Sequence, residues 1–158
     1  MVIQYFGQGE VKVSQGDWNL SFSAGKLRIG GRDGFEIVGP GEYEVNGTFV
    51  RAVPTDGPDN KINTAYSVLF DDIRLVHLGE SLGAIKAEAK EVLSDADILF
   101  SPSSDYATTL DPKIIIPMYE AKGKDLPKPV DKLVVKRKDL EGKEGEVVPI
   151  ISLPAAGR

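Results

Sequence analysis

The sequence contains no cysteine and a single histidine, His77. Without cysteine, the chain can form neither a disulfide bond nor a thiolate metal site, and it has no cysteine nucleophile. A serine triad has no specific support either, because the chain has no GxSxG segment and only one histidine that could act as its base. These absences remove the usual nucleophiles and most of the usual zinc ligands.

The chain also lacks long apolar runs and an excess of positive charge. Its formal net charge of −5 argues against a general nucleic-acid binder, which needs a basic surface to neutralise phosphates. No apolar stretch approaches the length of a membrane span, and the first ten residues have no basic region followed by an apolar run. We therefore expect a cytoplasmic protein that binds neither nucleic acid nor a membrane.

Glycine and proline are plentiful: the 158 residues include 17 glycines and 10 prolines. This content favours a β-rich fold with many turns over a helical bundle. Apolar residues make up 41% and charged residues 27%, as in an ordinary globular protein. The length predicts a single domain over residues 1–158, in which residues 152–158 form a flexible tail without periodicity.

Alternating apolar residues in the first thirty positions predict a meander of short antiparallel strands, and two later turn signals predict four more. Asn46-Gly47 supplies the two positive φ angles of a type I′ hairpin turn. Asp71-Asp72 is a short polar break between two apolar runs, as in another tight hairpin. The strands expected around these turns are Glu42–Val45, Thr48–Val53, Ala65–Phe70 and Ile73–Leu78.

Residues beyond 84 change to a helical period. Four apolar residues recur at i, i+4, i+7 and i+8, which predicts an amphipathic helix on the sheet. The buried-type runs Ile98–Phe100 and Ile114–Met118 predict strands that pair in parallel through a right-handed crossover. We expect the polar segment Ser101–Leu110 to be a loop. The helical apolar positions are Ile85, Ala89, Val92 and Leu93.

Several segments, in order, resemble one known fold. They are GPGEYEVNGTFVRAVP, INTAYSVLFDDIRLVHLGE, DADILFSP and PKIIIPM. Together they are similar to the metallo-β-lactamase fold, in particular to its small branch of ascorbate-6-phosphate lactonase-like hydrolases. The resemblance implies an α/β, β-rich αββα sandwich of two mixed β-sheets, here trimmed and with few helices. It also implies one or two zinc ions that activate water.

The motifs that bind metal in that family depart from the pattern here. The family's histidine-x-histidine-x-aspartate-histidine motif belongs between Phe22 and Ile37, but residues 23–34 read SAGKLRIGGRDG. A later family aspartate corresponds to Glu80 in His77-Leu78-Gly79-Glu80. A third family histidine corresponds to Tyr119, which follows Pro117-Met118.

The resemblance therefore leaves His77 and Glu80 as residual metal positions and Tyr119 as a candidate ligand-binding hydroxyl. A catalytic zinc normally has three protein ligands, and no third one stands out. The residues themselves favour a structural interpretation of His77, as a hydrogen-bonded residue at a strand end. They likewise favour Glu80 as a carboxylate at a helix start or in a loop, and Tyr119 as the edge of the core.

We expect a degenerate, non-catalytic protein with a binding or assembly role and no cofactor. A shortened fold leaves apolar surface uncovered, so a homodimer is expected, and another protein chain is a further possible partner. The alternative is a metal-dependent hydrolase of a phosphate- or lactone-containing small molecule, with zinc (Zn) or manganese (Mn) at a reduced site. The resemblance alone supplies that substrate class.

Overall fold

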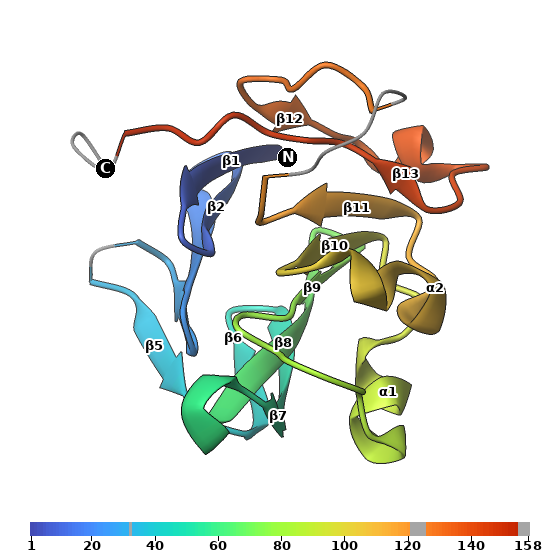
Figure 1. Ribbon diagram of the computed structural model, residues 1–158. Helices are drawn as coiled ribbons and strands as arrows, with labels where there is room; N and C mark the ends of the chain where they lie inside the picture. The colour runs from blue at the N-terminus through green and yellow to red at the C-terminus, as the bar shows by residue number, and fades with distance from the viewer. Residues whose placement is uncertain (32, 121–125, 155–158) are drawn as a thin grey trace.

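The computed structural model describes residues 1–31, 33–120 and 126–154, which fold into two facing β-sheets with two short α-helices (Figure 1). The β-rich, trimmed sandwich expected from the sequence is confirmed. In the described residues, no helix combines the length and hydropathy needed to cross a bilayer.

The first sheet has six strands in the order β12-β1-β2-β3-β4-β5. Its strand pairs are antiparallel; β1 to β4 form the predicted meander, and β5, which was not predicted, extends it. An isolated parallel bridge between Tyr5 and Ser152 adds the C-terminal segment to this sheet. The strands are β1 (Val2–Gly7), β2 (Glu10–Gln15), β3 (Trp18–Ser23), β4 (Lys26–Ile29), β5 (Phe35–Val38) and β12 (Leu133–Val134).

The second sheet has seven strands in the order β13-β11-β10-β9-β8-β7-β6. Strands β6 to β9 pair antiparallel, whereas β9, β10, β11 and β13 run parallel. Both predicted hairpins are confirmed, and Asn46 and Gly47 have φ angles of 49° and 84° at the first turn. The strands are β6 (Gly41–Val45), β7 (Thr48–Asp56), β8 (Ile62–Phe70), β9 (Ile73–His77), β10 (Ile98–Ser101), β11 (Ile114–Pro117) and β13 (Glu146–Val147).

The predicted amphipathic helix is confirmed as α1 (Ala87–Leu93), and β9 and β10 on either side of it pair in parallel. The prediction of a loop over Ser101–Leu110 is wrong. A 3₁₀ helix (Ser104–Tyr106) continues there into α2 (Ala107–Leu110). Tyr106 and Leu110 are buried against the outer face of the second sheet. Tertiary burial thus outweighs the polar composition of this segment.

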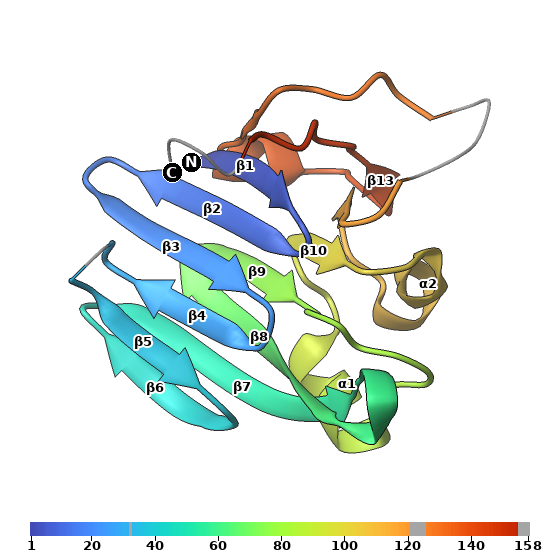
Figure 2. The same ribbon diagram turned by 60° about the vertical axis from the view of Figure 1, so that its left-hand side comes forward.

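The apolar residues form two groups on either side of the second sheet. The larger group fills the space between the sheets, and the smaller one lies between the second sheet and the helices. Figure 2 shows the two sheets facing each other. Fully buried members of the larger group include Ile3, Leu20, Phe22, Leu27, Leu75 and Phe100. Members of the smaller group include Val76, Ala89, Val92, Leu93, Leu99 and Leu110.

The outer face of the first sheet has no covering α-helix in the described part of the chain, since α1 and α2 both pack on the second sheet. Over β1 to β4 its outward side chains alternate with the buried ones and are mostly polar, so water can solvate this part of the face, whereas Val38 and Val134 on the two edge strands are exposed apolar residues. Examples are Gln4, Lys12, Ser14, Ser21 and Arg28. The trimming therefore removes one helical layer of the αββα arrangement.

The segment expected to be a flexible tail begins in contact with β1. Ser152 forms the bridge to Tyr5, and the Leu153 N–H donates a 2.8 Å hydrogen bond to the Tyr5 carbonyl. Residues 155–158 lie outside the described residues.

A candidate binding pocket between the two sheets

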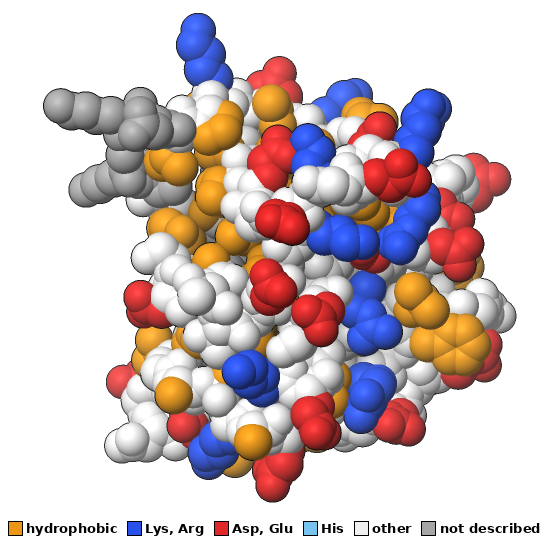
Figure 3. Space-filling view, turned by 90° about the vertical axis from the view of Figure 1, so that its right-hand side faces the viewer, with side chains coloured by type: hydrophobic (Ala, Val, Ile, Leu, Met, Phe, Trp, Pro, Cys, Tyr) orange, Lys and Arg blue, Asp and Glu red, His pale blue; other side chains and the backbone are white. Residues whose placement is uncertain are grey.

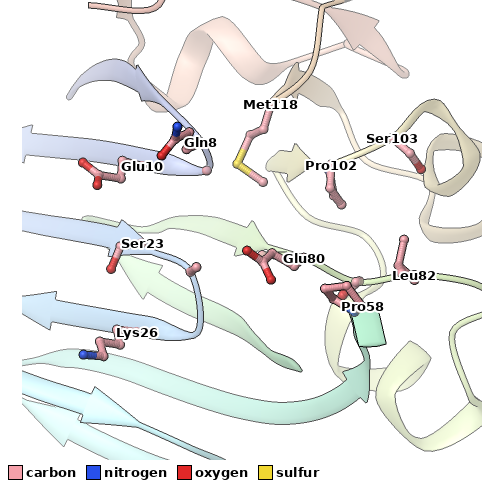
Figure 4. Close-up of a pocket in the computed structure, with 14 residues that line it drawn as sticks. Gln8, Glu10, Ser23, Lys26, Pro58, Glu80, Leu82, Pro102, Ser103 and Met118 are labelled. Carbon is pink, nitrogen blue, oxygen red and sulfur yellow. The ribbon is translucent and has the colours of Figure 1, made fainter. Parts of the chain in front are cut away.

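A pocket of about 690 Å³ opens where turns of the first sheet meet the loops that follow β9, β10 and β11 (Figure 4). Parallel strands bring their carboxyl ends to one edge, which places these three loops side by side. The first sheet contributes the β1–β2 and β3–β4 turns to the opposite wall. The lining residues include Gln8, Lys26, Pro58, Glu80, Leu82 and Met118.

His77 lies at the end of β9 beneath this pocket and is fully buried. Its Nε2 is 2.8 Å from the carbonyl oxygen of Gly9, and the Gly79 N–H lies 3.2 Å from its Nδ1. A carbonyl only accepts, so Nε2 carries the proton and Nδ1 is the acceptor. The ring stacks on Phe22 with an interplanar angle of 2° and a centroid distance of 4.8 Å.

These surroundings favour the neutral imidazole. Burial lowers the pKa of His77 to about 4, against the smaller opposing effect of its hydrogen bond to Gly9. Both ring nitrogens are already used in hydrogen bonds to backbone groups. His77 therefore connects the β1–β2 turn to the loop after β9, and its nitrogen lone pair does not face the pocket.

The loop after β9 is held by Asn63 at the start of β8. Its Nδ2 donates to the Leu78 carbonyl at 2.8 Å and lies within hydrogen-bonding distance of the Thr55 and Ser81 hydroxyls. Its Oδ1 accepts from the Glu80 N–H at 3.0 Å. These contacts fix the backbone of Glu80 without involving its carboxylate.

Glu80 is exposed, and its carboxylate makes no hydrogen bond or ion pair with another described residue. In Figure 4 this side chain lies at the centre of the pocket, and its carboxylate points toward the strands of the first sheet. Met118, at the end of β11, points toward it. Glu80 thus brings a carboxylate to an otherwise largely uncharged part of the cavity.

The other two charged side chains that line the pocket are turned elsewhere. The Lys26 ammonium lies 3.8 Å from Glu36 on the outer face of the first sheet, and the Lys26 side chain is 57% exposed. Figure 4 shows both this ammonium and the carboxylate of Glu10 directed away from Glu80. One carboxylate oxygen of Glu10 is inaccessible to solvent.

Tyr119 is half-buried and is not among the residues that line the pocket, although its neighbour Met118 is. Burial raises the pKa of the Tyr119 phenol, and the nearby carboxylate of Asp105 adds to this effect. Of the three sequence candidates, the structure therefore places Glu80 in the pocket, His77 beneath it and Tyr119 beside it.

The donor set present here does not fit a zinc centre. Zinc sites draw on several nitrogen, thiolate or carboxylate ligands, and the only histidine already has both nitrogens hydrogen-bonded. Among the described residues, no group of three or more His, Cys, Asp or Glu side chains could hold a metal ion.

Several residues that shape the pocket were not foreseen from the sequence. Asn63, Ser81 and Thr55 form the hydrogen-bonded support of the Glu80 loop, and Leu82 and Pro58 line the cavity. No local motif marks them, because each depends on contacts between segments 8 to 26 residues apart. The one sequence signal is that Thr55, Pro58 and Leu82 each adjoin a proline or a glycine, whereas Asn63 and Ser81 do not.

The chain matches a family model described as the β-lactamase superfamily domain over residues 31–119. The fold is similar to that of a Thermotoga maritima protein assigned as a Zn-dependent hydrolase of the metallo-β-lactamase superfamily. That similarity has a TM-score of 0.64 and 20% identity, over 94% of this chain and 97% of that one. The metallo hydrolase Igni18 from Ignicoccus hospitalis is also similar, with a TM-score of 0.54 and 11% identity, over 74% of this chain and 81% of that one.

No curated protein matches the sequence. At these identities, the two solved structures support the fold alone.

Proposed function

Because the chain belongs to the β-lactamase superfamily domain family, we propose that it is a non-catalytic member that binds a small molecule in the pocket between its sheets. The observation that carries this proposal is the position of His77. Its two ring nitrogens hold Gly9 and Gly79, so the one histidine serves the fold. The pocket remains as a cavity of ligand size.

Hydrolysis needs an activated nucleophile, which superfamily members usually obtain from metal-bound water. In this chain, recruiting His77 to a metal would break two hydrogen bonds and the stack on Phe22. If His77 keeps these contacts, Glu80 is the one family metal position that is left to bind a metal. Breaking the hydrogen bonds of this buried imidazole costs free energy, which favours a pocket that binds a ligand without metal-dependent hydrolysis.

The competing function is a metal-dependent hydrolase with a reduced site at His77 and Glu80. Two measurements separate it from the proposal: elemental analysis of protein purified from zinc- and manganese-supplemented medium, and hydrolysis assays with an aryl phosphodiester and a lactone. We expect substoichiometric metal and no hydrolysis above the protein-free rate. Both results should be the same for Glu80→Gln and for Glu91→Gln, which removes one exposed carboxylate from α1.

Stoichiometric metal that is lost in Glu80→Gln but kept in Glu91→Gln would overturn the proposal if hydrolysis followed the metal. Hydrolysis that is unaffected by Glu80→Gln would point to a different site and would also overturn it.

A role in assembly has less support than binding. The uncovered face of the first sheet is mostly polar over β1 to β4, and its exposed apolar side chains, Val38 and Val134, lie on separate edge strands. On the face that carries α1, α2 and β13, basic and acidic side chains are interspersed (Figure 3). The homodimer stays a prediction, and a monomer in sedimentation at high protein concentration would contradict it.

A further inference from the structure

We infer that the ligand of this pocket is a small organic cation with an apolar body, whose positive group pairs with the Glu80 carboxylate. This inference rests on the proposed binding function and specifies its ligand. It depends on three features of the pocket: its charge, its apolar lining and the support of Glu80.

The first feature is the charge that faces the cavity. Glu80 makes no ion pair with any described residue, whereas the Lys26 ammonium lies 3.8 Å from Glu36 on the outer face of the sheet. An adjoining pocket of about 380 Å³ shares Glu80 and is also lined by Asp59 and Lys61, which have opposite charges. The free carboxylate therefore gives this part of the cavity a negative potential, which attracts cations.

The second feature is the apolar wall of the pocket beside Glu80. Met118, Leu82, Pro58 and Pro102 all line the same pocket, and Leu82 is 53% exposed although it is a large apolar side chain. In Figure 4 these residues lie on the side of Glu80 that faces the second sheet and its loops, opposite Gln8 and Ser23 of the first sheet. A hydrated metal ion gains nothing from such walls, whereas the hydrocarbon part of an organic cation can cover them.

The third feature is rigid support. The Glu80 N–H donates to Asn63 Oδ1 at 3.0 Å, and Asn63 is buried among the hydroxyls of Thr55 and Ser81. A carboxylate on a fixed backbone loses less conformational freedom when it binds a ligand than one on a mobile loop. The hydrogen bonds of Asn63 thus fix the backbone from which the Glu80 side chain extends into the cavity.

The test is an NMR titration of ¹⁵N-labelled protein with three probes that share a pentyl chain: pentylamine as the cation, pentanol as the neutral analogue and hexanoate as the anion. At neutral pH, we expect pentylamine to shift the amide signals of Glu80, Leu82 and Met118 and to bind about tenfold more tightly than either other probe. Glu80→Gln should remove this preference, and Glu91→Gln should keep it.

The inference is overturned if hexanoate binds more tightly than pentylamine, if the three probes bind alike, or if no probe shifts the pocket amides. It is also overturned if Glu80→Gln retains the preference while its spectrum shows an intact fold. These outcomes concern the ligand alone. The metal analysis and the hydrolysis assays test separately whether the protein is non-catalytic. Hydrolysis in those assays would instead overturn the function, even if pentylamine bound.

Discussion

The Nε2 of His77 lies 2.8 Å from the carbonyl oxygen of Gly9, although 68 positions separate the two residues in the sequence. This hydrogen bond joins the end of β9 in one sheet to the β1–β2 turn of the other. Gly79 completes the link by donating to Nδ1 of the same ring. The histidine is thus a connection between the two walls of the pocket.

The pH dependence of stability tests this role. Burial lowers the pKa of His77 in the folded protein to about 4, against 6.5 for an ordinary histidine. Between pH 6.5 and pH 4 the unfolded chain binds a proton that the folded chain does not. The free energy of unfolding should therefore fall as the pH decreases through this window, by on the order of 3 kcal/mol.

Urea denaturation at several pH values measures this effect, with His77→Gln as the control, because a glutamine amide can still donate to Gly9. The difference between the two proteins cancels the carboxylates that titrate in both. Equal pH slopes for the two proteins between pH 6.5 and pH 4 would contradict the assignment.

Gly79→Ala tests the loop that carries Glu80. Gly79 has a φ of 60°, and an added Cβ would lie 2.7 Å from Asn63 Oδ1. Gly83 is the matched position, because its φ is 73° and its added Cβ meets nothing within 4 Å. Both variants should lose about 1 kcal/mol of stability to backbone strain, and Gly79→Ala should lose at least about 1 kcal/mol more.

Urea denaturation measures both losses. Equal losses in the two glycine variants would show that the contact between the added Cβ at Gly79 and Asn63 does not lower stability.

Asp97, a buried residue at the start of β10, is predicted to be a structural anchor. Its Oδ2 accepts from the Arg74 N–H at 2.8 Å and from Arg137 at 2.7 Å, and Lys113 lies 2.9 Å from its Oδ1. Burial by itself raises the pKa of Asp97, but these three partners outweigh it and hold the pKa below the ordinary value of 3.8. Its contribution is therefore present above pH 3.8 and is lost as the pH falls further.

Asp97→Asn should lower the free energy of unfolding at neutral pH by about 2 kcal/mol, because it removes the charge of a buried carboxylate that accepts three hydrogen bonds. Glu146→Gln is the control. It breaks the 2.6 Å pair with Lys143, in which both side chains are about two-fifths exposed, and should cost under about 1 kcal/mol. Similar losses for both variants would contradict the anchoring role.

Leu93→Ala tests whether α1 depends on the sheet beneath it. Leu93 is completely buried against the second sheet, and α1 has only seven residues, too few to be stable alone. Thermal and urea unfolding should show a loss of about 2–5 kcal/mol. Ile62→Ala, at a side chain that is 76% exposed, should change stability by less than about 0.5 kcal/mol. A small effect at Leu93 would contradict this packing.

Local patterns in the sequence predicted much of the fold. The Asn46-Gly47 turn and the Asp71-Asp72 turn lie where expected, because positive φ angles and the alternation of strands are local properties. The period of the apolar residues around Ala89 likewise identified α1. The polar segment that contains α2 was mistaken for a loop, because its helix depends on the burial of Tyr106 and Leu110.

The sequence by itself determined which donors this protein lacks: with one histidine and no cysteine, it offers few of the nitrogen and sulfur ligands on which zinc sites usually draw. Only the tertiary structure decided what the remaining residues do. It placed His77 between Gly9 and Gly79, and it left the carboxylate of Glu80 facing a cavity. The physical reason is that composition limits the available donors, whereas contacts between distant segments determine which donors are satisfied and which face a ligand.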